Sequence, residues 1–358
     1  MNPLYCILPP HILEALAAAG DEPVSTWAQR SLEADAAIRT ERAAVALGLR
    51  SVAAPVPTRL PHRQRSLYDA GSGSTLPGRA VRSEGQAPTG DQAVDEAYDA
   101  LGATFDLYWD VYDRDSIDDA GMELVGSVHY LSNYDNAFWN GTQMVFGDGD
   151  GTYFNRFTAA VDVVGHELTH GVTAHEANLT YRDQPGALNE SVSDVFGSIV
   201  KQFSHSPPQT AAEADWLIGA GLFTARVNGV ALRSMKDPGT AYDDPVLGKD
   251  PQPAHMSGYV ATTDDNGGVH INSGIPNRAF YLAAVALGGH AWERAGAIWY
   301  ATLGDARLSP DAEFKDFASL TTDNAGRLYD DAAREAVATA WHDVGVETSV
   351  AALERGAS

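Results

Sequence analysis

Two histidines four residues apart constrain this chain more than any other feature of its sequence. His166 and His170 stand in VDVVGHELTH, where apolar residues recur at the spacing of one helix face. On a helix, side chains at i and i+4 leave the same face one turn apart, so two imidazoles can share one Zn²⁺. Glu167 would then lie beside the metal and hydrogen-bond a water molecule. The pattern predicts a helix that carries a zinc site.

A third candidate ligand follows twenty residues after His170. Glu190 opens a second helical pattern, NESVSDVF, and falls on its inward face, with Asp194 one turn further on. Two histidines and one carboxylate leave a fourth position on zinc open, as catalytic rather than structural zinc sites do. The alternative interpretation of Glu190 is a solvated charge near a helix start.

Charge and cysteine content exclude several other classes of protein. The 358 residues carry 24 basic and 48 acidic side chains, a net charge of −24, which argues against nucleic-acid binding. Cys6 is the only cysteine, so the chain can form no internal disulfide and no cysteine-based zinc finger. We expect no membrane association, because no apolar run reaches the roughly 18 residues of a membrane span.

The acidic excess divides the chain near Arg65. Residues 1–65 hold 7 basic and 6 acidic side chains, whereas residues 66–358 hold 17 and 42. The first part is interpreted as helix over 9–48, followed by a Pro- and Arg-rich linker open to cleavage from Ser51 onward. Its start has no basic residue before the apolar stretch, so we expect no standard secretory signal.

The larger part is predicted to change from strands to helices along its length. A helix over 91–113, with an aromatic face expected to pack in the core, precedes alternating strand patterns over 122–155. GDGDG is interpreted as a turn rather than an EF-hand-like loop, because Ala159 stands where the twelfth position from Asp148 requires glutamate. The remaining helices are predicted over 159–176, 188–203, 211–225, 274–288, 291–303, 310–318 and 331–344.

Several motifs in one order resemble the thermolysin-like family of zinc endopeptidases. They are HELTH (166–170), GALNESVSD (186–194), NAFWNGTQMVFGDGDG (136–151), ALRSMKDP (231–238) and DNGGVHINSGI (265–275). LPPHILEALA near the start and TLPG-x-x-VRSEG (75–85) are similar to the protealysin branch, whose members carry a short propeptide. Independent motifs in register across residues 130–345 make the resemblance specific.

The resemblance implies an α+β fold of two lobes, β-rich toward the N-terminus and mainly helical toward the C-terminus, with the zinc helix between them. A small helical propeptide precedes the lobes. We expect propeptide and linker over 1–60, the β-rich peptidase domain over 61–164 and the helical peptidase domain over 165–358. The propeptide would inhibit the enzyme, which would remove it between about Gly48 and Arg65.

The resemblance also implies a role for individual residues in peptide hydrolysis. The zinc ligands would be His166, His170 and Glu190, holding one ion per chain. Glu167 would be the general base, Tyr181 and His270 would stabilise the oxyanion, and Asp265 would orient His270. Without the resemblance, the polar DNGG context also fits a surface loop histidine at His270.

Further residues are expected to support the ligands or bind substrate. Since a ligating histidine donates its second N–H to an oxygen, Asp194 is expected to serve His166 and Asn189 to serve His170. Asn136, the Ala137 backbone and Arg233 resemble groups that hold the substrate main chain. Six apolar residues match the pocket for the residue after the scissile bond, with core packing as the alternative for each: Phe154, Phe157, Val163, Ile218, Leu222 and Leu232. We expect cleavage before a bulky hydrophobic residue.

The sequence departs from the family at the double calcium site. Asp162 and Asp215 match its acidic residues, but Lys201, Leu217 and Ala220 stand where carboxylates are required. Too few oxygen ligands remain for Ca²⁺, and the Lys201 cation would stand in its place. We therefore expect the double site to be absent and Lys201 to pair with Asp162 or Asp215.

Two other functions stay open on the sequence. A zinc exopeptidase shares HExxH with a distal glutamate, although no motif for capturing a free α-amino group is present. A zinc-holding peptide-binding protein without catalysis is disfavoured by the joint occurrence of Glu167, Tyr181 and His270. Cys6 could cap the zinc in the precursor or, as is commoner for a lone cysteine among apolar residues, be a buried hydrophobe.

The resemblance also bears on partners and location. We expect peptide or protein substrates and a monomeric enzyme. Family members commonly act outside the cell, so secretion is expected. Because the start of the chain shows no standard signal, unconventional export and intracellular action remain alternatives.

Overall fold

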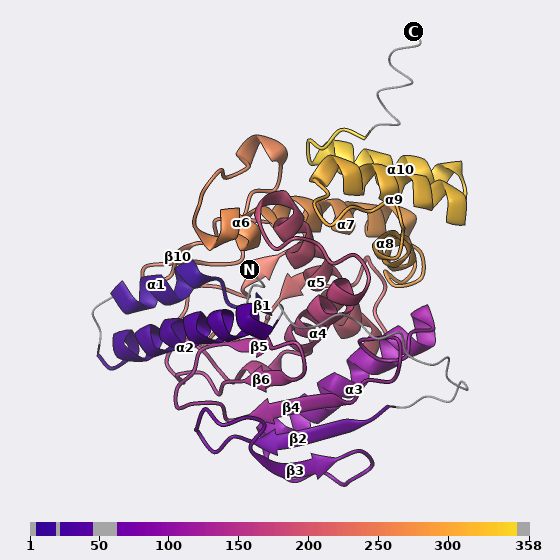
Figure 1. Cartoon of the computed structure of the whole chain (residues 1–358). Helices are drawn as coiled ribbons and strands as arrows, with labels where there is room; N and C mark the ends of the chain where they lie inside the picture. Colours follow the sequence, from indigo (N-terminus) through magenta and orange to yellow (C-terminus); the bar gives the residue numbers. More distant parts are fainter. Residues whose placement is uncertain (1–4, 19–21, 46–62, 349–358) are drawn as a thin grey trace. The chain divides into compact units, whose positions relative to one another are not determined.

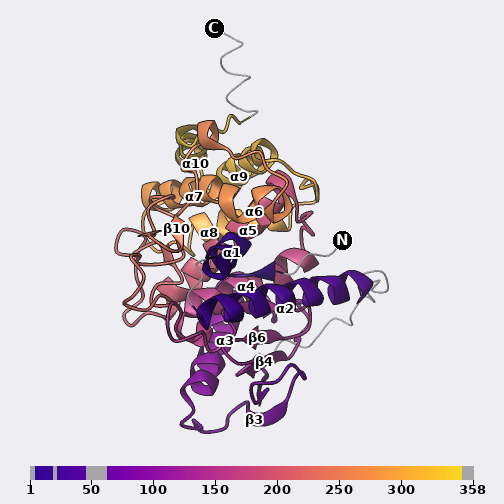
Figure 2. The ribbon, with the colours of Figure 1, turned by 90° about the vertical axis from the view of Figure 1, so that its left-hand side faces the viewer.

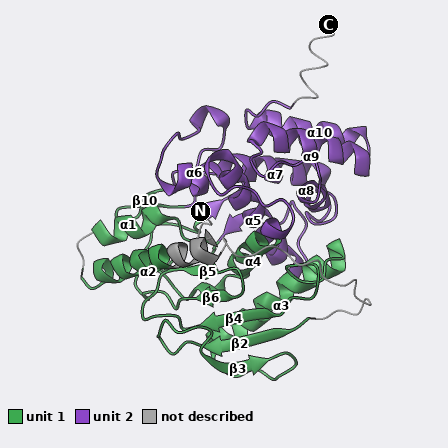
Figure 3. Cartoon of the chain, viewed as in Figure 1, with its two compact units in different colours: residues 1–172, 219–232, 242–249 green, residues 173–218, 233–241, 250–358 purple. Residues whose placement is uncertain are grey.

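The structure, a computed structural model, describes residues 5–18, 22–45 and 63–348. The chain forms two compact units (Figure 3). The first unit comprises residues 1–172, 219–232 and 242–249, and the second comprises residues 173–218, 233–241 and 250–358. The cleavage region predicted between about Gly48 and Arg65 lies almost wholly outside the described residues.

The first unit is built on a six-stranded sheet of order β1-β5-β6-β4-β2-β3 (Figure 1). Its strands are β1 (Tyr5–Cys6), β2 (Arg65–Asp69), β3 (Arg79–Ser83), β4 (Leu124–Val128), β5 (Ala137–Trp139) and β6 (Met144–Phe146). The pairs β2/β4 and β4/β6 are parallel, and the other three pairs are antiparallel. The N-terminal strand β1 therefore forms one edge of the sheet, beside β5.

Helix α3 (Gln92–Tyr112) packs against β2 and β4. The carboxylate of Asp91 caps its start, accepting the N–H groups of Ala93 and Val94. Asp113, in the left-handed conformation, ends it. The predicted helix is thus confirmed. Of its predicted aromatic side, Tyr98, Phe105 and Tyr108 are buried in the core, whereas Trp109 and Tyr112 are half-buried.

The N-terminal segment folds into two helices of the first unit, α1 (Pro10–Ala18) and α2 (Val24–Val45), which lie side by side (Figures 1 and 2). Ile12, Leu13 and Leu16 of α1 are fully buried. The predicted helical character of this segment is confirmed. The strand β1 that precedes the helices was not predicted.

Helix α4 (Val161–His175) begins in the first unit and ends in the second. It follows a short 3₁₀ turn, η1 (Phe157–Ala159). A small hairpin of β9 (Asp243–Asp244) and β10 (Gly248–Lys249) completes the first unit. The predicted turn at GDGDG is confirmed, because the Asp150 carboxylate accepts the N–H groups of three residues that follow it, Thr152, Tyr153 and Phe154.

The second unit is mainly helical and is organised around α5 (Asp183–Ser204), which contacts α6 to α9. Every residue from 185 to 200 is buried, as expected of a helix surrounded by others. The other helices are α6 (Asp265–Asn272), α7 (Gly274–Leu287), α8 (Ala295–Leu303), α9 (Phe314–Leu328) and α10 (Asp331–Asp343), with a 3₁₀ turn η2 (Met256–Gly258) and a two-stranded pair of β7 (Leu217–Ile218) and β8 (Arg233–Ser234).

The predicted α+β class, with a β-rich N-terminal region and a helical C-terminal region, is confirmed. The helix predicted over 211–225 is wrong. That segment forms turns and the strand β7, because Gly219 and Gly221 adopt positive φ angles of 71° and 87° that break a helix. Among the described residues, no helix combines the length and the apolar run needed to cross a membrane.

Candidate functional site

Helix α4 presents both histidines of HELTH on one face. The side chains of His166 and His170 are fully buried, and their Nε2 atoms lie 3.0 Å apart. Gly171 lets the helix approach β5, because a Cβ there would lie 2.5 Å from Cγ2 of Ile117 and 3.2 Å from Nε1 of Trp139. The predicted helix, and the joint orientation of its two imidazoles, are therefore confirmed.

Glu167 is fixed between α4 and the sheet of the first unit. Its carboxylate is fully buried, and Oε2 accepts the backbone N–H of Trp139 on β5 at 2.9 Å. A buried carboxylate needs such a donor to offset the cost of leaving water. This donor was not predicted from the sequence, although Trp139 lies inside the NAFW motif.

The second unit gathers Tyr181, Glu190 and His270. The Tyr181 hydroxyl donates to Oε1 of Glu190 and lies 3.3 Å from Nε2 of His270. The other Glu190 oxygen is 3.5 Å from the same nitrogen. The structure thus brings together, within one unit, the residue predicted as third zinc ligand and the two predicted to stabilise an oxyanion.

Asp265 holds His270 from the other side of the ring. It accepts the His270 Nδ1 proton at 2.7 Å and the His270 backbone N–H at 2.9 Å. The chain can close this tight turn because Gly267 and Gly268 adopt φ angles of 90° and 74°, and a Cβ at Gly267 would collide with Asp183. The DNGG sequence therefore positions His270 rather than exposing it on a surface loop.

The charges around His270 favour its protonated form. Burial alone would lower its pKa, but the carboxylates of Asp265 and Glu190 and the Asp265 hydrogen bond outweigh burial and raise the pKa to about 9. With Nδ1 directed to Asp265, the proton on Nε2 faces Tyr181 and Glu190. This nitrogen can therefore donate a hydrogen bond to a developing negative charge.

Asp194 and Arg233 form a buried ion pair in the second unit. The guanidinium of Arg233 binds the Asp194 carboxylate with two hydrogen bonds, of 2.9 and 2.8 Å, and Asn277 donates to it at 2.8 Å. Burial lowers the pKa of Arg233, and Asp194 raises it above its ordinary value. Asn189 donates to the carbonyl of Leu179 at 3.3 Å. Asn277 follows the last family motif and was not predicted as a site residue.

Asn136 and Ala137, predicted to hold substrate main chain, bind the N-terminal segment. The Asn136 Oδ1 accepts the Leu8 N–H at 3.1 Å, and the Ala137 carbonyl accepts the Ile7 N–H at 3.3 Å. Further along the same edge, β1 runs antiparallel to β5, with Cys6 opposite Phe138. Groups expected to bind a substrate backbone are therefore occupied by the chain's own backbone.

The six apolar residues predicted to line a substrate pocket are all buried. They are Phe154, Phe157, Val163, Leu222 and Leu232 in the first unit and Ile218 in the second. The rings of Phe154 and Phe157 pack with their centroids 5.7 Å apart. Burial fits both a pocket wall and ordinary core packing, so their predicted role stays a prediction.

Lys201 has the ion pair expected for it. Its Nζ lies 2.8 Å from Oδ1 of Asp215 and donates to the Leu217 carbonyl at 2.6 Å. In the first unit, Asp162 accepts the N–H groups of Val163 and Gly219. These contacts occupy oxygen atoms at positions that match the family's calcium ligands.

Cys6 is a buried hydrophobe. It packs in an aromatic cluster with Tyr130, Tyr134, Phe138 and Val145, and its Sγ lies 3.7 Å from the Leu8 carbonyl oxygen. This environment agrees with the commoner of the two interpretations of a lone cysteine.

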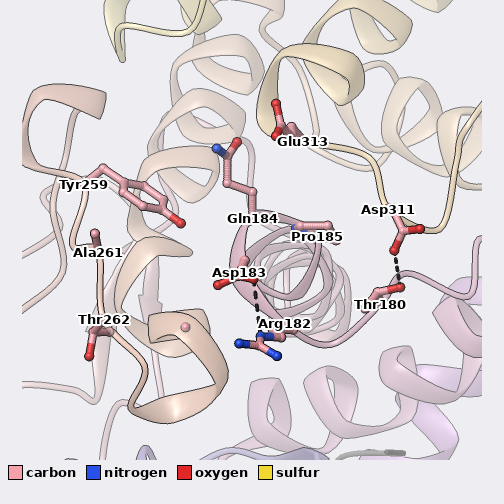
Figure 4. A pocket seen from close by; sticks show the side chains of 11 residues that line it. Thr180, Arg182, Asp183, Gln184, Pro185, Tyr259, Ala261, Thr262, Asp311 and Glu313 are labelled. Carbon is pink, nitrogen blue, oxygen red and sulfur yellow. Dashed lines mark hydrogen bonds and ion pairs between the residues drawn. The ribbon is translucent and has the colours of Figure 1, made fainter.

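A pocket of about 540 Å³ lies in the second unit, lined by residues on both sides of Tyr181 in the chain and by Gly267, three residues before His270 (Figure 4). Its lining includes Thr180 and Arg182, which flank Tyr181, together with Asp183 and Glu313. Burial and the charges of these two acids raise the pKa of Tyr259, which also lines the pocket. The pocket therefore has more acidic than basic side chains in its lining, Asp183, Asp311 and Glu313 against Arg182.

Two family models match the chain. The thermolysin metallopeptidase catalytic domain matches residues 58–174, and the thermolysin metallopeptidase alpha-helical domain matches residues 177–346. An extracellular metalloprotease of Pectobacterium carotovorum subsp. carotovorum is 53% identical over 349 residues, which are 97% of each chain. Protease PrtS of Photorhabdus sp. (strain Az29) is 53% identical over 285 residues, 79% of this chain and 76% of its own.

A solved structure resembles the whole chain. The precursor of protealysin, a metalloproteinase from Serratia proteamaculans, matches with a TM-score of 0.85 and 53% identity, covering 96% of this chain and 99% of its own. With both family models and relatives at this identity, the chain belongs to the thermolysin (M4) family of metallopeptidases, in its protealysin-like branch, and is a metalloendopeptidase.

Proposed function

We propose that the chain is the precursor of a zinc endopeptidase that binds one Zn²⁺ through His166, His170 and Glu190. The observation that carries the proposal is the pair of buried imidazole nitrogens 3.0 Å apart on α4. Two imidazoles and one buried carboxylate suit zinc and leave a coordination position open. When bound, zinc polarises a peptide carbonyl and lowers the pKa of a water molecule.

Glu167 is the general base in this proposal. Its carboxylate takes a proton from the attacking water and passes it to the nitrogen of the leaving amine. The N–H of Trp139 supports this role, because it fixes one oxygen and so orients the other. The carboxylate is buried, which strengthens its interactions with charges that form during the reaction.

Tyr181 and His270 stabilise the oxyanion formed by attack on the carbonyl. Both carry a proton on an atom that contacts Glu190, and Asp265 holds the His270 ring in place. Donors fixed before the reaction need no reorganisation when the charge develops. Asp194 orients His166 and Asn189 orients His170, as the rule for ligating histidines suggests. The ion pair with Arg233 supports a fixed Asp194 carboxylate.

The substrates are peptides or proteins cleaved before a bulky hydrophobic residue. Asn136, Ala137 and Arg233 bind the substrate main chain. The residue after the scissile bond enters a pocket lined by Phe154, Phe157, Val163, Ile218, Leu222 and Leu232. Their burial and apolar character support a preference for hydrophobic side chains.

The N-terminal segment is an inhibitory propeptide that the enzyme removes itself. The binding of Ile7 and Leu8 to Ala137 and Asn136 supports inhibition, because it occupies proposed substrate-binding groups. The similarity to a protealysin precursor supports a zymogen. We propose the division into propeptide and linker (1–60), β-rich domain (61–164) and helical domain (165–358).

Two further points complete the proposal. The enzyme is a secreted monomer. Relatives named extracellular metalloproteases support secretion. It lacks the double calcium site, which the Lys201–Asp215 ion pair supports. Unconventional export and intracellular action stay alternatives.

The central test measures hydrolysis by the purified mature protein. Casein and a peptide blocked at both ends should be cleaved, activity should disappear with a zinc chelator, and added Zn²⁺ should restore it. Glu167→Gln, expected to fold normally, is the inactive control. Activity indifferent to the chelator would contradict the proposal, and cleavage of unblocked peptides alone would indicate an exopeptidase.

Self-processing has its own test. The full-length Glu167→Gln protein should keep its N-terminus during purification, whereas the wild-type chain should lose it. Equal rates of loss in purified samples would show that another protease removes the propeptide.

A further inference from the structure

Helix α2 of the N-terminal segment places two polar side chains, Ser31 and Asp35, on its buried face. They are four residues apart, so they share that face, whereas Glu33 between them is exposed. Asp35 is only 1% exposed. An acidic side chain this deeply buried needs specific hydrogen-bond donors to offset its loss of water.

Three consecutive residues just before β5, at positions 134–136, form hydrogen bonds with this face of α2. The Tyr134 hydroxyl donates to one Asp35 oxygen at 2.5 Å, and the Asn136 amide donates to the other at 3.0 Å. Between them, the Asp135 N–H donates to the Ser31 hydroxyl at 3.3 Å. The two donors to Asp35 form a carboxylate-binding site, and hydrogen bonds to an ionised carboxylate are among the strong ones in proteins.

The Asn136 side chain is bound at both ends by the N-terminal segment. Its Nδ2 group donates to Asp35 on α2, and its Oδ1 accepts the Leu8 N–H that follows β1. An amide donates only through nitrogen and accepts only through oxygen. The bond to Asp35, together with the Ala137 N–H that Oδ1 accepts at 3.0 Å, therefore fixes the orientation in which Oδ1 faces Leu8.

Polar contacts are important here because residues 131–134 do not fill the space beside α2. A cavity of about 510 Å³ lies between α2 and residues 131–134, lined by Trp27, Ser31 and Ala34 on the helix side. Burial and the charge of Asp35 raise the pKa of Tyr134 well above its ordinary value, so this hydroxyl remains a donor.

We infer that Tyr134 and Asn136 form a carboxylate-binding site. In the precursor, Asp35 fills this site and so holds the Asn136 amide in its hydrogen bond with the inhibitory segment; this arrangement is the Asp35 lock. This inference rests on the proposed zymogen function. Asp35 is a positioning residue that acts through Asn136. When the propeptide leaves, the site opens, and the Asn136 amide becomes able to turn toward a substrate main chain.

The first test measures the lock without catalysis. Hydrogen–deuterium exchange is compared in full-length chains that all carry Glu167→Gln, with Asp35→Asn, Tyr134→Phe or both changes added. Losing a charge-assisted hydrogen bond should raise exchange in residues 5–9 by about tenfold or more and leave α3 unchanged. Glu33→Gln, an exposed acid on the same helix, is the matched control and should match the parent chain.

The double variant separates a direct contact from general loosening. If Asp35 and Tyr134 act through one contact, the double variant should exchange little faster than either single variant. Three outcomes would each overturn the inference. The fold-increases in exchange of the two single variants could multiply in the double variant, exchange in residues 5–9 could equal that of the parent chain, or exchange in α3 could rise by the same factor.

A second test uses the active chain. Asp35→Asn should shorten the half-life of precursor conversion severalfold, while the mature enzymes, which lack residue 35, should have equal kcat/KM. If Asp35→Asn raises exchange in residues 5–9 as expected but no chain has peptidase activity, the proposed function is wrong, whereas the contact between Asp35 and Asn136 is still supported. If conversion occurs at the wild-type rate despite faster exchange, the lock does not control maturation.

Discussion

Asp135 carries a buried carboxyl group with weak hydrogen-bond compensation. Its side chain is fully buried, and neither oxygen has a donor at ordinary hydrogen-bond geometry in the described part of the chain. Burial raises the pKa of Asp135 well above its ordinary value, and the negative charge of nearby Asp150 raises it further, while the Asp150 backbone N–H offsets these effects only in part. Such a group stabilises a fold less at neutral pH than a neutral side chain of the same shape.

Asp135→Asn should therefore stabilise the protein above the ordinary pKa of aspartate, near pH 3.9. Above that pH the unfolded chain loses a proton that the folded chain keeps, so stability falls until the pH passes the raised folded pKa. Asp135→Asn has no such proton to lose. Its free energy of unfolding should therefore exceed that of the parent by on the order of 1 kcal/mol at pH 8 and equal it at pH 3. Urea unfolding across this range, in Glu167→Gln chains, measures the difference. Parallel stability profiles for the two chains would contradict the argument.

Tyr181→Phe tests a donor that contacts both Glu190 and His270. Removing one oxyanion donor typically lowers kcat by about 100- to 1000-fold. We expect a loss of this size in the mature enzyme, with KM changed little, because the hydroxyl acts mainly in the transition state. Steady-state kinetics on a blocked peptide measure both constants. Tyr259→Phe in the same unit is the control. A comparable loss of kcat in that variant would contradict a specific role for Tyr181.

At the scale of elements, hydrophobic periodicity predicted the long helices well. Residues 161–175, 183–204 and 92–112 form α4, α5 and α3 near the predicted positions, because each buries an apolar face. Strands β2 and β3 were not predicted in the Pro- and Gly-rich segment before α3. Strand β1 has only two residues and depends on pairing with β5, a long-range contact that local patterns do not contain.

The candidate site was predictable where its residues lie in short motifs. His166, Glu167 and His170 needed only helix geometry, while Tyr181, His270 and Asp265 needed the family resemblance. The contact between Asp35 and Tyr134 could not be predicted from the sequence, since a single acid in a helix is ordinarily interpreted as solvated surface. Their contact joins residues 99 positions apart in the chain, which only folding reveals.

The start of α3 contains a pH-dependent contact. His129 lies between Asp91, the cap of α3, and Asp148, at 3.1 and 2.8 Å. Burial lowers the pKa of His129, but hydrogen bonds and charges from Asp148 and Asp91 raise it overall. The protonated ring therefore links the helix start to the loop after β6.

His129→Asn should cost more stability at acidic pH than at alkaline pH. A raised folded pKa means that the contribution is fully present below the unfolded pKa of about 6.5 and is lost as pH rises through the folded value. We expect a loss of roughly 0.5 kcal/mol at pH 5, since the group is partly exposed, and a smaller loss at pH 9. Asparagine suits the left-handed backbone of this position, where φ is 56°. Melting curves at both pH values measure the difference, and equal losses would exclude the charge effect.

At the scale of the whole molecule, the proposed chemistry draws on both units. The first unit supplies His166, Glu167 and His170 together with the N-terminal segment proposed to inhibit, and the second supplies Tyr181, Glu190 and His270. Each unit arranges its own residues by internal contacts, such as the Trp139 N–H on Glu167 and Asp265 on His270. Neither unit alone carries the complete set, so the proposed activity needs residues from both units.

Whole-molecule stability should be independent of calcium. Lys201 lies 2.8 Å from Asp215, and Leu217 and Ala220 supply no carboxylates at the matching positions. A ligand that binds the folded state alone stabilises it by about 2.7 kcal/mol at a hundredfold excess over Kd, a shift of several degrees in Tm. We expect no such shift when the full-length Glu167→Gln chain is titrated with Ca²⁺ and melted.

Mg²⁺ at the same ionic strength is the control for charge screening on this acidic protein. A rise in Tm that is specific to Ca²⁺ and saturates at one or two equivalents would show a double site despite Lys201. Lys201→Glu, melted in parallel, removes the cation and adds a carboxylate. If Ca²⁺ raises the Tm of this variant and leaves the parent unchanged, the lysine itself excludes the metal. If neither chain responds, the missing carboxylates at Leu217 and Ala220 suffice to exclude it.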